Sequence, residues 1–228
     1  MTTTTTRRRW RPLAATVLLA ALAAGCTATQ PTSFYTLSAD TEGKAAPRAH
    51  QGLTVGLGPV TLPAYLDRPD IVTREGPNQM RLAEFHRWAE PLEPLLARIM
   101  AQDLHALLDA EDVLPVPQRR DLRLDRVVEV EVNRLDADQT GQVVLDARWW
   151  VYAGDGDALL ASGRSRVTEQ GAAPPDYAAI AAAMSRAVAG ASRDIATAIR
   201  GGAPVPTPKR GAEAKAASAP SVVPRPGS

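Results

Sequence analysis

Three consecutive segments in the middle of the chain alternate apolar and polar residues, and this pattern restricts the fold more than any other feature. The segments are Leu122 to Leu135, Val143 to Ala153 and Ala158 to Glu169, joined by the short polar loops DADQTG and GDGD. Successive side chains of a strand point to opposite faces, so each segment has one apolar and one polar face. We therefore predict an antiparallel meander with one packed face and one partly wet face.

Two further segments have the three- and four-residue spacing of amphipathic helices. The first begins near Leu92, because Glu93 suits a helix N-terminus and Pro94 is tolerated only in the first turn. The second follows Pro174-Pro175-Asp176 and ends at Gly201-Gly202. Its expected apolar stripe is Tyr177, Ile180, Met184, Val188, Ala191, Ile195 and Ile199.

The region before the first helix has strand patterns at Phe34 to Leu37, Leu53 to Leu62, Ile71 to Arg74 and Gln79 to Trp88. The turn signal EGPN between the last two predicts a hairpin. The glycines of VGLGPV lack the lysine and hydroxyl of a phosphate loop, so we interpret them as a bulged strand. We predict an α+β fold: a mixed, mainly antiparallel sheet with two long helices packed on one face, in a single domain.

The N-terminus has the layout of a secretory leader, with four arginines before an apolar run that ends in Ala-Gly-Cys. The run is about a dozen residues, short of the ~20 that span a bilayer as a helix. It resembles the lipobox of bacterial lipoproteins, so we expect residues 1–25 to be a signal peptide and Cys26 to be lipidated, with a tether over 26–32. An ordinary signal peptide containing a cysteine is the alternative, and twin-arginine export remains open.

The anchor predicts a membrane-bound protein, because several acyl chains hold far more firmly than one. In lipoproteins of this kind an Asp after the cysteine retains the protein at the inner membrane. Thr27 is not Asp, so we expect the periplasmic face of the outer membrane. Residues 203–228 are rich in Pro, Ala and Ser, which predicts a disordered tail after a domain at 33–202.

Charge and composition exclude several functions. The chain has 26 basic and 25 acidic residues, and four of the basic ones lie in the leader, so the rest is slightly acidic and no nucleic-acid partner is expected. The three histidines, His50, His86 and His105, are isolated in sequence, and His50 and His105 are expected to be exposed. No metal-ligand spacing, nucleophile motif or cofactor motif is present, so we expect no metal, no cofactor and no catalytic residue.

One group of side chains keeps an enzymatic alternative open. Paired carboxylates near a histidine can do acid/base work, which makes a periplasmic envelope hydrolase the competing hypothesis. Arginines next to these acids in sequence explain them equally well as ion pairs. The acids and histidine are Asp67, Asp70, Glu75 and His86, and the arginines are Arg68, Arg74, Arg81 and Arg87.

Two long motifs resemble the ABC-type transport auxiliary lipoproteins, the PqiC-like family. They are VGLGPVTLPAYLDRPDIVTR and NQMRLAEFHRWAEPLEPLLARIMAQDL, and the likeness continues from FYTL at the start through LDRVVEVEVNRLDADQTGQVVLDARWWVY. The resemblance covers about Ser33 to Gly202. The motif residues that we carry over as a possible interface are Tyr65, Arg68, Pro69, Arg74, Trp88 and Pro91.

The resemblance implies a non-enzymatic, membrane-anchored docking subunit of a mammalian-cell-entry (MCE) type lipid transport system. It further implies contact with the MCE tunnel protein and a homo-oligomeric ring. A structural or assembly lipoprotein unrelated to transport is a third hypothesis, which shares the anchor.

Overall fold

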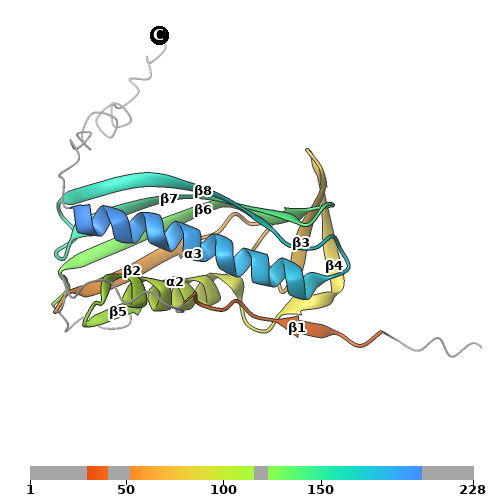
Figure 1. The fold of residues 1–228 in the computed structure, drawn as a ribbon, viewed down its shortest axis with the longest axis horizontal. Helices are drawn as coiled ribbons and strands as arrows, with labels where there is room; N and C mark the ends of the chain where they lie inside the picture. Colours follow the sequence, from red (N-terminus) through yellow and green to blue (C-terminus); the bar gives the residue numbers. More distant parts are fainter. Residues whose placement is uncertain (1–29, 41–51, 116–122, 202–228) are drawn as a thin grey trace, which may run out of the picture. The chain divides into compact units, whose positions relative to one another are not determined.

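The computed structural model describes residues 30–40, 52–115 and 123–201. The leader with Cys26, His50 and the C-terminal tail lie outside these residues. The unit from Ser33 onward contains eight strands and two helices in the described part (Figure 1). They are β1 (Ser33–Tyr35), β2 (Thr54–Thr61), β3 (Asp70–Gly76), β4 (Gln79–Trp88), α2 (Leu92–Leu108), β5 (Asp112–Pro115), β6 (Arg126–Asp138), β7 (Gln142–Ala153), β8 (Leu159–Gln170) and α3 (Tyr177–Gly201).

All eight described strands join one mixed sheet. The order is β1-β4-β3-β6-β2-β5, and β7 and β8 extend from β6 as a second branch. β6, β7 and β8 pair antiparallel in long ladders, and β3 and β4 form the predicted hairpin. The β1–β4, β2–β5, β2–β6 and β3–β6 pairings are shorter and parallel. The α+β fold with a mixed sheet is therefore confirmed.

Both helices cover one face of the sheet and form the core with it (Figure 1). The predicted stripe of α3 is buried throughout, and so are Leu92, Leu95, Leu96 and Ile99 of α2. α2 begins at Leu92 as predicted. Asp176 caps α3 by accepting a hydrogen bond from the Ala179 N–H at 3.0 Å. Among the described residues, neither helix combines the length and apolar character needed to cross a membrane.

The structure shifts some predicted boundaries and adds one strand. β6 runs over 126–138, not 122–135, and the four-residue β5 was not predicted. The bulge in VGLGPV is confirmed, because the β2–β6 register shifts between Leu57 and Val60. Gly58 has φ 136° there, a conformation that favours glycine.

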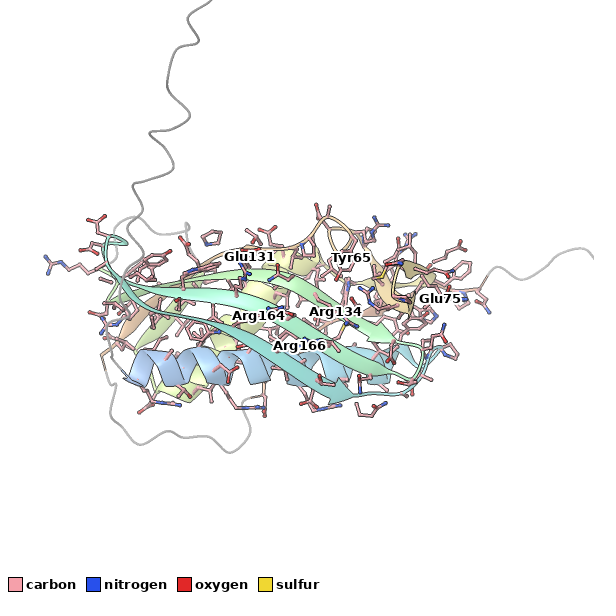
Figure 2. All side chains as sticks on the ribbon, turned by 90° about the horizontal axis from the view of Figure 1, so that it is seen from above. Tyr65, Glu75, Glu131, Arg134, Arg164 and Arg166 are labelled. Carbon is pink, nitrogen blue, oxygen red and sulfur yellow. The ribbon has the colours of Figure 1, made fainter. Side chains whose placement is uncertain are left out.

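The segment between β2 and β3 is a tight bend. The Leu66 N–H donates to the Pro63 carbonyl at 2.9 Å, and the Arg68 N–H donates to the Leu66 carbonyl at 2.8 Å. Leu66 is buried beneath the bend, while Asp67 is exposed. The bend holds Tyr65 beside the face of the sheet that the helices leave open, which we call the open face (Figure 2).

Candidate functional site

A fully buried carboxylate organises the open face where β3 meets β6. Asp136, on β6, has no exposed side-chain surface. Arg74 of β3 donates to it from Nε and Nη2 at 3.1 Å each, and Arg134 of β6 donates from Nε at 3.0 Å. Arg134 Nη2 makes a fourth contact with Asp136 at 2.8 Å, and the Tyr65 hydroxyl donates a fifth at 3.2 Å. Two cations and one phenol thus meet one buried anion.

The electrostatics of this cluster keep Tyr65 protonated. Burial, and next the negative charge of Asp136, raise the pKa of Tyr65 to about 12. The phenol therefore acts as a hydrogen-bond donor and not as a base at neutral pH. The cluster holds one carboxylate and two guanidiniums, so one positive charge remains uncompensated, and both arginines keep about a quarter of their side-chain surface exposed, at 24% and 28%.

A second carboxylate repeats this arrangement on the neighbouring strands. Asp146 of β7 is buried and lies opposite Arg134 of β6 and Arg166 of β8 in the strand register. Arg164 of β8 donates to Asp146 from Nε at 2.8 Å, and this contact holds the pKa of the carboxyl below its usual range. Figure 2 shows Arg134, Arg164 and Arg166 gathered over the strands, with Glu131 beside them. A belt of arginines thus runs across β3, β6, β7 and β8.

Five of the six motif residues fall into two groups in the structure. Tyr65 and Arg74 belong to the Asp136 cluster. Pro69, Trp88 and Pro91 lie elsewhere, where β4 ends and α2 begins: the Trp88 N–H donates to the Pro69 carbonyl at 2.7 Å, and the Pro91 carbonyl accepts from Leu95. Trp88 is buried, so it supports this junction from within.

Arg68 stands apart from both groups. Its Nε is buried and has no hydrogen-bond partner in the described part of the chain. An unpartnered buried donor costs roughly 1–3 kcal/mol. Arg68 is thus a motif residue whose position is set by the bend, without a polar contact at Nε that explains it.

The residues of the hydrolase hypothesis do not come together as an acid/base site. Asp70 pairs with Arg87 at 3.1 Å, and Glu75 forms an ion pair with Arg81, as the alternative interpretation proposed. His86 stacks on Tyr177 with ring centroids 4.1 Å apart. Its Nδ1 shares a hydrogen bond of 2.8 Å with the Tyr35 hydroxyl. In the described ranges, no three His, Cys, Asp or Glu side chains are grouped as metal ligands.

Of the arginines in these two clusters, only Arg74 was among the predicted site residues; Arg134, Arg164 and Arg166 were not, and neither was the role of the buried Asp136 and Asp146. The polar face predicted for the segment Val143 to Ala153 is confirmed, and it carries Asp146, Arg148, Trp150 and Tyr152. Asp136 was assigned to a loop, because the polar run DADQTG resembles one, and it lies within β6 instead. An aspartate opposite arginines on adjacent strands is the signal that points to this cluster, and it requires the strand pairing to be known.

One more buried carboxylate lies far from the open face. Asp103 of α2 sits between the two helices, where it accepts a hydrogen bond from the Asp40 N–H at 2.8 Å and one from the Ser192 hydroxyl at 3.3 Å. Burial raises the pKa of Asp103 to about 6. Its partners belong to the framework of the fold, so this carboxylate joins elements of the domain.

Comparison with solved structures shows the same fold in two crystal structures. One, of an uncharacterized protein, is 19% identical with a TM-score of 0.60, over 75% of this chain and 99% of that one. The other, protein XCC0632 from Xanthomonas campestris, is 18% identical with a TM-score of 0.60, over 74% and 96%. A search of curated protein sequences found no match.

Comparison with protein families identifies the motifs. Residues 35–196 match the model of the ABC-type transport auxiliary lipoprotein component. This range contains both long motifs, the Asp136 cluster, all of α2 and most of α3. The chain therefore belongs to the family of ABC-type transport auxiliary lipoprotein components.

Proposed function

We propose that this protein is the membrane-anchored, non-catalytic docking subunit of an MCE-type system that moves lipids between the inner and outer membranes. Cys26 carries the lipid anchor, the domain stands at the periplasmic face of the outer membrane, and the domains assemble as a homo-oligomeric ring around the end of the MCE tunnel protein. The match of residues 35–196 to a transport auxiliary component is the single observation that carries the proposal.

The geometry of the open face supports a binding role. Its two buried carboxylates, Asp136 and Asp146, are occupied by arginines, and its one phenol with a strongly raised pKa is held as a donor. Such an arrangement supplies fixed charges and hydrogen bonds for recognition, and no described group is poised as a nucleophile or base.

The test is affinity capture of the full chain from detergent-solubilised envelopes, with mass spectrometry of the proteins and lipids that accompany it. We expect the MCE protein, its permease and its ATPase to co-purify. Purification of the chain with none of these three components, after crosslinking in intact cells, would contradict the proposed function.

Anchoring has its own test. We expect the wild-type chain to incorporate labelled palmitate and the Cys26→Ser variant to incorporate none and to leave the membrane fraction. If both forms remain in membranes and neither takes up label, the anchor at Cys26 is wrong.

A further inference from the structure

The positive charge of the open face is concentrated on β7 and β8. Arg148, Arg164 and Arg166 are exposed there, and the carboxylate among them, Asp146, is buried and held by Arg164. No ion pair joins Arg148 or Arg166 to another described residue. We call the open face of these two strands the β7–β8 patch; its members are Asp146, Arg148, Trp150, Tyr152, Ser162, Arg164, Arg166 and Thr168.

Strand pairing fixes the arginines in a regular array. Arg148 lies directly opposite Arg164, and Asp146 lies directly opposite Arg166. Like charges opposite each other on paired strands are unfavourable. The fold therefore holds positive charge on this surface beyond what its own carboxylates neutralise, and an anionic group bound there would relieve the repulsion.

The neighbouring β6 does not cancel this charge. Its open-face carboxylates are Glu129, Glu131, Asp136 and Asp138. Asp136 is enclosed by Arg74 and Arg134, and Asp138 accepts hydrogen bonds from the backbone N–H groups of the turn that follows β6. Glu131 lies opposite Arg148 and Glu129 lies opposite Trp150. Glu131 thus partly offsets Arg148, while Arg164 and Arg166 share the single carboxylate of Asp146 on the β8 side.

The residue types of the patch are those of protein interfaces. Arginine, tryptophan and tyrosine are enriched where proteins bind one another, and they supply most of the residues whose truncation costs binding energy. Trp150 and Tyr152 are half-buried next to the arginines on β7. In addition, no described strand pairs with the outer edge of β8. Charged side chains along such an edge oppose non-specific pairing and leave it for a specific neighbour.

We propose that the β7–β8 patch binds an acidic segment of a partner protein, with Arg148, Arg164 and Arg166 contacting its carboxylates and Trp150 and Tyr152 packing beside them. The inference rests on the proposed function only in expecting this partner within the transport assembly. An anionic membrane surface fits less well, because the exposed large apolar residues of the described chain, Phe34 and Leu82, lie on β1 and β4 and not in the patch.

The experiment uses the full-length lipidated chain in its native cells, with a photoreactive amino acid in place of Ser162. Ser162 is exposed in the patch opposite Trp150. The captured molecules are identified by mass spectrometry. The crosslink yield is then compared in the Arg148→Gln/Arg166→Gln variant, which leaves the Arg164–Asp146 pair in place. The matched control is Arg186→Gln/Arg193→Gln, which removes two exposed arginines from α3.

We expect a crosslinked peptide of net negative charge, a loss of yield of at least tenfold in the patch variant, and a change of less than twofold in the control. Thermal unfolding of each variant checks that the fold is kept, and Arg148→Ala/Arg166→Ala is used if the first variant does not fold. Capture of phospholipid alone, of basic or neutral peptides, of a second copy of this chain, or of nothing overturns the inference, as does an unchanged yield in the patch variant. An arginine-dependent acidic peptide from outside an MCE system supports the inference and contradicts the proposed function, so the two failures are distinguishable.

Discussion

Two of the three buried aspartates of the described chain, Asp103 and Asp136, show how the same side chain is accommodated in two ways. Asp103, between the helices, is 1% exposed and meets a backbone N–H and a hydroxyl. Asp136, under the open face, is 0% exposed and meets two guanidiniums and a phenol. Neutral dipoles leave the buried charge of Asp103 expensive, so the pKa of this carboxyl rises. At Asp136 two guanidiniums contact the carboxylate instead, at the centre of a charged surface.

The difference teaches where this fold tolerates charge. Between the helices a proton can neutralise the carboxyl of Asp103, and this side chain joins α2 to α3 and to the segment at Asp40. On the open face the carboxylate fixes two arginines that keep part of their side-chain surface exposed. Each of the following changes tests one side of this contrast.

Replacing Asp136 has the largest expected effect on stability. Asp136→Ala leaves Arg74 and Arg134 without their shared anion, and removing one partner of a buried pair costs about 3–5 kcal/mol. Urea unfolding followed by circular dichroism measures the loss. The control is Glu131→Ala, an exposed acid of the same strand, whose expected change is within about 0.5 kcal/mol. Equal losses in the two variants would show that Asp136 does not organise the surface.

Asp103 is expected to make stability depend on pH. Its folded pKa of about 6 lies above the ordinary value, so the folded state binds the proton more tightly and the free energy of unfolding falls as pH rises from about 4 to about 6. Asp103→Asn keeps an acceptor for the Asp40 N–H and removes this titration. The free energy of unfolding of the variant should therefore rise relative to that of the wild type, by on the order of 2–3 kcal/mol, as pH increases across this range.

Denaturation of both proteins at several pH values gives the comparison. The difference between the two stability curves isolates Asp103 from the other carboxyls, which titrate in both proteins. A difference that stays constant between pH 4 and pH 7 would mean that Asp103 is not buried as a carboxyl with a raised pKa.

Tyr65 gives the smallest of the three effects. Tyr65→Phe removes one donor from Asp136 while the guanidinium contacts remain, so we expect a loss of about 1 kcal/mol. Tyr152→Phe, on the same face, is the matched variant and should change little. The loss at Tyr65 should disappear in an Asp136→Ala background; a cost that persists there would assign Tyr65 a role independent of the carboxylate.

Sequence patterns predicted the parts of the fold that have a local signal. The alternation from Val143 to Ala153 and the spacing of apolar residues in both helices follow directly from strand and helix geometry. β5 has only four residues and pairs parallel with β2, a contact that no local pattern encodes. The predicted C-terminal boundary of β6 was too early, because polar residues at the end of a strand resemble a loop.

The site was predictable only in part. The motif indicated that Tyr65 and Arg74 matter, but not that both turn to Asp136, which lies more than sixty residues later and becomes their neighbour through the parallel β3–β6 pairing. Asp103 was missed because a polar residue in a helix reads as solvent-exposed unless the packing of the second helix is known. Pairing between distant segments, and not residue type, carried the missing information.

The most direct test of the account is complementation of a deletion strain, scored as restored envelope resistance to detergent. We predict that the Asp67→Asn/Asp70→Asn/His86→Gln variant, which removes the hydrolase candidates, restores resistance fully. We predict that Arg148→Gln/Arg166→Gln, at equal protein levels, does not. The opposite result, with the triple variant inactive and the arginine variant functional, would contradict a docking role and favour an enzyme.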